Sequence, residues 1–167
     1  VMLGKIDVYE NPKNHIYLTD GQQRLTTLFL LIGMLNKNTE LEDAKKYLIS
    51  DYELEEGTKT PYLQYAIRET TLFFLQDLVN EYFINADQNQ DLKSIKKANW
   101  YFDEYNLDPS ICSMLLALES IEERLKKVKN KVAFCEFVIN QVKIQYYDVE
   151  NRQHGEERFV IINTTGK

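Results

Sequence analysis

The chain has 167 residues, of which 44% are hydrophobic and 28% charged, as in a globular domain with room for an inserted subdomain. It has neither a run of roughly 20 apolar residues that could cross a bilayer nor a secretion signal, so we expect a cytoplasmic protein. The net charge of −6 arises in residues 41–142, which carry 12 basic and 18 acidic side chains, so the basic stripe of a DNA-binding surface is missing.

The first 40 residues predict a strand hairpin followed by a buried helix. Residues 3–8 and 15–19 are the two expected strands, and the polar segment 11–14 is the turn between them. Asp20-Gly21 breaks the second strand. Nearly every position in residues 25–35 is apolar, which indicates a helix that is buried on most sides.

The middle of the chain has a mainly helical pattern. Asp108-Pro109 is a typical helix start, with Asp108 as the cap and Pro109 in the first turn. The cysteines, Cys112 and Cys135, lie in apolar helical patterns, and we expect both to be reduced core thiols. Helical segments are expected over residues 40–49, 62–83, 92–105 and 111–128, and residues 52–60 form an acidic stretch before a loop.

After Asn140 the apolar period changes to two, which predicts a strand over residues 142–147, and residues 157–162 are again apolar. Strands at both ends of a chain often join one sheet. We therefore predict an α+β fold in which residues 1–40 and 143–167 form a small sheet core and residues 41–142 a large, mainly helical insertion. Neither chain end resembles a finished terminus, so we expect a fragment of a longer protein.

The segment Asp20-Gly21-Gln22-Gln23-Arg24 has the features of an anion site. The glycine lets the backbone turn from strand to helix, and the first helical turn supplies backbone N–H groups and the positive end of the dipole. Arg24 can add a bidentate contact to phosphate, and Thr26 and Thr27 add hydroxyls. Asp20 could cap the helix or face a metal ion. An ordinary helix cap with a solvated first turn is the alternative.

A second polar segment, Asn163-Thr164-Thr165-Gly166, offers an amide, two hydroxyls and a flexible backbone. Asn163 and Gly166 could contact the base, ribose or phosphate of a nucleotide. A simple turn with an asparagine cap is the alternative.

Three stretches of the chain resemble the GmrSD-type restriction and defence family. The segment from Tyr17 to Leu28 contains that family's Asp-Gly-Gln-Gln-Arg string, Phe159 to Gly166 is similar to its Phe-x-x-x-Asn-(Ser/Thr)-x-Gly element, and Leu3 to Ile6 fits its Leu-Gly-x-Ile strand. The resemblance implies a ParB/sulfiredoxin-like core whose glycine–arginine turn binds a nucleotide. The family's upstream Gln-Arg-x-Tyr-x-Trp-like segment is missing from this sequence.

The resemblance also implies an activity and its participants. We expect hydrolysis of a nucleoside triphosphate, GTP or ATP, with Mg²⁺. Arg24 would hold phosphate charge in the transition state, the backbone of Gly21–Gln23 would cradle the phosphate, and Gln22 or Gln23 would orient water. Asp20 would be a base or a Mg²⁺ contact. DNA would be bound through other parts of the full-length protein and cut by a C-terminal nuclease domain or subunit; homo-oligomerisation stays open.

Other nuclease and nucleotidase chemistries fit the sequence poorly. The two histidines, His15 and His154, are far apart, and neither a zinc-ligand spacing nor a P-loop occurs. Asp148-x-Glu150 is a metal pair or, by the simpler interpretation, a solvated strand end. Two rival functions remain: a nucleotide- or DNA-sensing module without turnover, and an interaction domain whose motifs only shape the fold.

Overall fold

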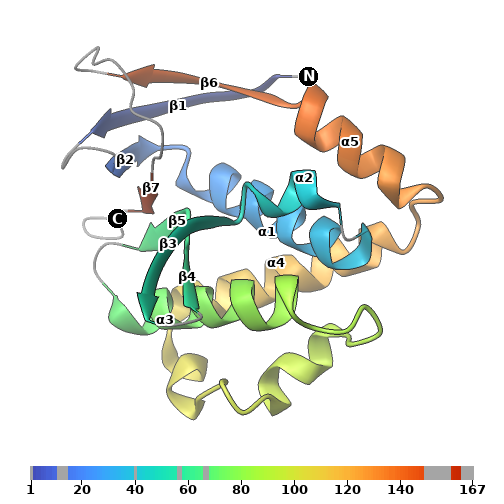
Figure 1. The fold of residues 1–167 in the computed structure, drawn as a ribbon. Coiled ribbons are helices and arrows are strands. Elements are labelled where there is room, and N and C mark those ends of the chain that lie inside the picture. The colour runs from blue at the N-terminus through green and yellow to red at the C-terminus, as the bar shows by residue number, and fades with distance from the viewer. Residues whose placement is uncertain are drawn as a thin grey trace.

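The computed structural model describes residues 2–10, 15–39, 41–55, 58–65, 68–148 and 159–162. Figure 1 shows a sheet on one side of the molecule and helices on the other, with the long helix α1 (Gln22–Thr39) between the sheet and α4 (Pro109–Leu125). This arrangement confirms the α+β class. No helix among these residues combines the length and the apolar character that a membrane span requires.

Five strands form the main sheet in the order β5-β7-β2-β1-β6. β1 and β2 are antiparallel, β6 is parallel to β1, and β7 is parallel to both β2 and β5. The strands of the two chain ends therefore lie in one sheet, as the sequence predicts, whereas the domain boundaries at residues 40/41 and 142/143 stay a prediction. The strands are β1 (Met2–Glu10), β2 (His15–Asp20), β5 (Leu63–Tyr65), β6 (Lys143–Asp148) and β7 (Phe159–Ile162).

Residues 41–83, for which the sequence predicts helices around an acidic stretch and a loop, contain three strands that were not expected. After the short helix α2 (Glu42–Lys45), β3 (Ile49–Glu55) and β4 (Thr58–Pro61) form a separate antiparallel pair. β5 then begins inside the long helix predicted from Tyr62. Leu63 and Tyr65 are buried and Gln64 is half-buried, an alternation over three residues that the surrounding helical spacing conceals.

The rest of the helical block is divided more finely than its pattern suggests. α3 (Glu69–Asp77) continues as π-helical turns, η1 (Leu78–Ile84), and residues 92–105 contain no α-helix but two 3₁₀ segments, η2 (Leu92–Lys97) and η3 (Asp103–Leu107). α4 (Pro109–Leu125) has the predicted cap and buried stripe, and a separate helix, α5 (Lys131–Gln141), precedes β6.

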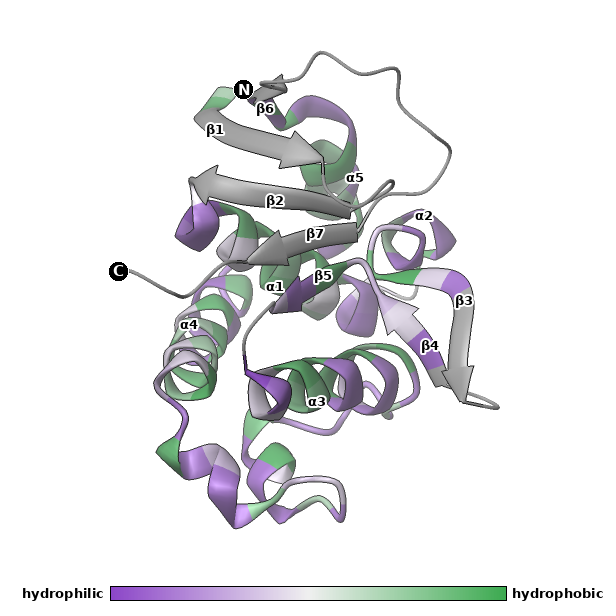
Figure 2. Cartoon of the chain, turned by 90° about the vertical axis from the view of Figure 1, so that its left-hand side faces the viewer, coloured by the Kyte–Doolittle hydropathy of each residue, from purple (hydrophilic) through white to green (hydrophobic). Residues whose placement is uncertain are grey.

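The core forms where α1 (Gln22–Thr39) meets α4, α5 and η1. Figure 2 shows α1 and α5 behind the strands of the sheet, with hydrophobic stretches in green on α1, α4 and α5. A Cβ atom at Gly33 would lie 2.2 Å from the Phe83 ring, so the glycine permits α1 and η1 to approach closely. Asn36 fixes the same contact because its side chain donates a 2.9 Å hydrogen bond to the Phe83 carbonyl. The cysteines are both free, and Cys135 is buried as expected, whereas Cys112 is only half-buried.

Candidate functional site

The turn between β2 and α1 has the geometry that the sequence predicts. β2 ends at Asp20, Gly21 has a φ of 84°, and α1 begins at Gln22. A positive φ favours glycine, because a side chain in this conformation meets the following carbonyl. The Leu25 N–H donates to the Gly21 carbonyl over 3.1 Å, which closes the first helical turn. The N–H groups of this first turn lie at the positive end of the helix dipole.

The side chains at the start of α1 divide into two sets. Gln23, Arg24 and Thr27 are exposed, whereas Gln22 and Thr26 are half-buried. The first turn of the helix carries no acidic side chain. An exposed guanidinium therefore adds to the positive end of the helix dipole, and together they favour an anion.

This turn lies at the edge of the sheet where three parallel strands end. Leu18 of β2 pairs with Ile162 of β7, and Ile162 also pairs with Tyr65 of β5. The carboxyl ends of β2, β7 and β5 therefore share one edge, the place where open sheets with parallel strands bind ligands. Asn163 follows β7 directly in the sequence, but Asn163 and Gly166 lie outside the described residues, so their predicted contacts stay predictions.

Tyr65 is a residue at this edge that the sequence reasoning missed. Its hydroxyl lies 3.4 Å from the Thr26 Oγ1, so β5 of the helical block touches the second turn of α1. Burial raises the pKa of Tyr65, the nearby Asp108 raises it further, and the hydrogen bond with Thr26 opposes them. The side chain is neutral at physiological pH and acts through its hydroxyl. The alternation of Leu63 and Tyr65 is the sequence signal that could have indicated it.

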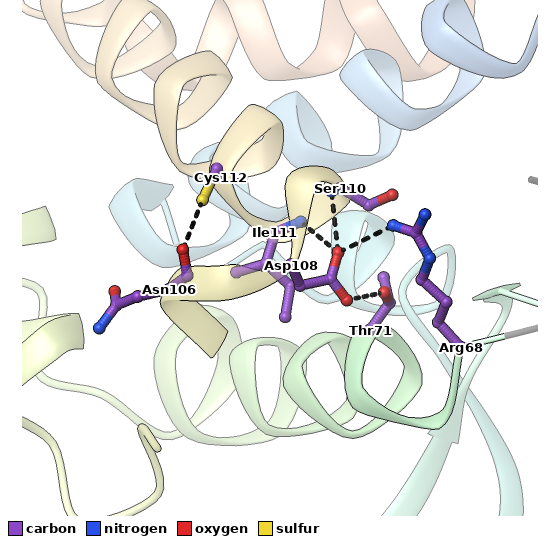
Figure 3. Close-up of polar contacts among 7 residues, drawn as sticks. All are labelled: Arg68, Thr71, Asn106, Asp108, Ser110, Ile111 and Cys112. Atoms are coloured by element: carbon purple, nitrogen blue, oxygen red, sulfur yellow. Dashed lines mark hydrogen bonds and ion pairs between the residues drawn. The ribbon is translucent and has the colours of Figure 1, made fainter. Parts of the chain in front are cut away.

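Beyond Tyr65, the starts of α3 and α4 are tied together by Asp108. Its carboxylate, 5% exposed, accepts hydrogen bonds from the Ser110 N–H at 2.8 Å and the Ile111 N–H at 3.3 Å, which confirms the predicted cap. Figure 3 shows two further donors converging on it, the Thr71 hydroxyl and, at 3.4 Å, the Arg68 guanidinium. The four donors satisfy the carboxylate, so this cluster serves the fold.

The predicted metal contact at Asp20 is not tested, because its side chain lies outside what the structure describes. Asp7 of β1 is the register partner of Asp20, next to an irregularity in the pairing of β1 with β2. Within the part of the chain that the structure describes, no three His, Cys, Asp or Glu side chains gather to hold a metal ion. The role of Asp20 with Mg²⁺ stays a prediction.

The family model described as the GmrSD restriction endonuclease, N-terminal domain, matches residues 1–167. No curated protein and no solved structure matches the chain.

Proposed function

The chain belongs to the GmrSD restriction endonuclease N-terminal domain family, which makes it part of a restriction or defence protein, and on that premise we propose that it binds and hydrolyses a nucleoside triphosphate. The phosphates lie at the start of α1, and GTP and ATP, each with Mg²⁺, are the candidate substrates. The sheet is the ParB/sulfiredoxin-like core that the family resemblance implies.

One observation carries this proposal. Gly21, whose φ lies in the left-handed region, directly follows β2 at the edge of the sheet where the carboxyl ends of three strands meet. It directly precedes a helical turn with an exposed arginine. Backbone N–H groups, the helix dipole and a guanidinium all favour phosphate oxygens at this point. The step from phosphate to nucleoside triphosphate depends on the family.

Each motif residue has a role in the proposed reaction. The backbone of Gly21–Gln23 cradles the phosphate, and Arg24 stabilises the charge that moves onto the phosphate oxygens in the transition state. Gln22 or Gln23 orients the attacking water, and Asp20 is a base or a Mg²⁺ contact. Asn163, Gly166, Thr26 and Thr27 hold the rest of the nucleotide. DNA is bound through other parts of the full-length protein, and a C-terminal nuclease domain or subunit cuts it.

Arg24→Ala tests the proposal directly. Isothermal titration with GTP and with ATP, each with Mg²⁺, is expected to show affinity reduced by about tenfold or more, because a charged hydrogen bond to phosphate contributes about 1.5–3 kcal/mol. Lys97→Ala is the matched control: it removes one exposed cation from η2, which lies below α3 in Figure 1, away from β2. Equal affinity for the Arg24→Ala variant and the unchanged chain would refute the assignment.

Phosphate release in a single-turnover assay then separates an enzyme from a sensor. Release that depends on Arg24 supports hydrolysis. Nucleotide binding without release would make the domain a sensing module, and a strongly salt-dependent affinity for duplex DNA without any for nucleotide would indicate direct DNA contact.

A further inference from the structure

A mainly apolar cavity of about 480 Å³ opens beside α1, between α4 and the start of α5. Leu31, Ile121 and Phe134 are among its apolar lining residues. The polar side chains in its lining are Thr27, Ser120 and Arg124. A concave apolar lining with a few polar groups is typical of a small-molecule site.

The cavity and the anion site lie along one face of α1. Arg24, Thr27 and Leu31 are spaced i, i+3 and i+7, so they lie on the same face of the helix. Arg24 belongs to the anion site, and both Thr27 and Leu31 line the cavity. At about 1.5 Å per residue, Arg24 and Leu31 are roughly 10 Å apart along the axis, which is comparable to the distance from the phosphates to the base of an extended nucleotide.

The opposite wall has a matching stripe. Ala117, Ser120 and Arg124 follow the same spacing on α4 and all line the cavity. The small side chains of Ala117 and Ser120 leave room for a flat group between the two helices. Arg124 supplies donors, and the hydroxyls of Ser120 and Thr27 both donate and accept.

We propose that this cavity binds the base of the nucleotide whose phosphates lie at Gly21–Arg24; the inference rests on the proposed function. The faces of the base pack against Leu31, Ile121 and Phe134, since every nucleobase presents apolar faces that bury well against such side chains. The polar edge of the base meets Thr27, Ser120 and Arg124. The helical block thereby takes part in nucleotide binding, and α1 carries the phosphate site at its start and the base site further along.

The test compares a ligand with a base and one without it. Inorganic tripolyphosphate, GTP and ATP, each with Mg²⁺, are titrated into the unchanged chain and into Ser120→Phe, which places a ring at the exposed rim of the cavity. We expect the nucleotides to bind the unchanged chain about tenfold or more tightly than tripolyphosphate does. In Ser120→Phe this advantage is lost, while the affinity for tripolyphosphate stays within about twofold.

Leu116→Phe is the matched control, because it adds a ring on the same helix at a position that is 64% exposed and outside this cavity. It leaves all three affinities unchanged. Ala117→Leu is a second cavity-filling variant with the same expected result as Ser120→Phe, and thermal unfolding checks that each variant folds.

The outcomes separate this inference from the function on which it rests. If Arg24→Ala weakens all three ligands but Ser120→Phe and Ala117→Leu preserve the advantage of the nucleotides, the base lies elsewhere and the phosphate site stands. Equal affinities for tripolyphosphate and the nucleotides in the unchanged chain also overturn the base site. If neither tripolyphosphate nor nucleotide binds the unchanged chain, both proposals fail.

Discussion

Two helix starts in this molecule use polar residues in opposite ways. At the start of α4, Asp108 is almost completely buried, and its carboxylate accepts from two N–H groups of the helix as well as from Thr71 and Arg68. At the start of α1, a left-handed glycine precedes a first turn without acidic side chains but with an exposed arginine. Two N–H groups at the start of α4 donate to the Asp108 carboxylate, whereas the start of α1 carries the exposed cationic side chain of Arg24 at the edge of the sheet. Only the second arrangement suits an external anion.

The largest effect that follows from this comparison is on stability. Asp108→Ala removes the cap of α4 and leaves the buried Thr71 hydroxyl and Ile111 N–H without their acceptor. We expect the free energy of unfolding to fall by about 3 kcal/mol, measured by urea denaturation. Asp108→Asn keeps one acceptor oxygen and is expected to lose about half as much. A loss below about 1 kcal/mol for the alanine variant would show that the cluster contributes little to the fold.

Gly21→Ala breaks the other helix start. An alanine at a φ of 84° costs about 1–2 kcal/mol, and the backbone that cradles the phosphate must shift to relieve the strain. We expect nucleotide affinity to fall by more than stability does, whereas Gly21→Asn, which tolerates this conformation, retains more of both. If Gly21→Ala lost stability yet bound nucleotide normally, the turn would serve the fold just as Asp108 does.

The same comparison shows what the sequence can and cannot predict. Gly21 and Asp108 act through local backbone geometry, so residue type and position are sufficient to predict the turn and the cap. Tyr65 contacts Thr26, which lies 39 residues earlier in the sequence. The strand of Tyr65 is only three residues long, and the helical spacing on both sides hides it. Its place beside the motif follows from the pairing of β5 with β7, which no local pattern specifies. The cavity beside α1 likewise depends on how three helices meet.

The carboxylate of Asp77, at the end of α3, offers a contrast with that of Asp108, whose four donors favour its charged form. Burial first, and then Glu81, raise the pKa of Asp77 from 3.8 to about 6. The folded state therefore binds this proton more tightly than the unfolded chain does, and its stability falls as the pH rises from about 4 through 6. We expect Asp77→Asn to raise the free energy of unfolding by about 1 kcal/mol at pH 8, allowing for partial exposure, and to change it little at pH 4. A uniform effect at both pH values would exclude the titration of Asp77 as its cause.

The smallest expected effect concerns the contact that joins β5 to α1. Tyr65→Phe removes a hydroxyl whose hydrogen bond to the Thr26 Oγ1 is long, at 3.4 Å, so we expect a loss of only about 0.5 kcal/mol. A double-mutant cycle with Thr26→Val isolates the pair and should give a coupling energy of similar size. Nucleotide affinity should change by less than about twofold if Tyr65 only packs against α1 and does not contact the nucleotide. A tenfold loss of affinity at unchanged stability would instead place the Tyr65 hydroxyl among the groups that hold the nucleotide, and the binding site would then extend from the start of α1 onto β5.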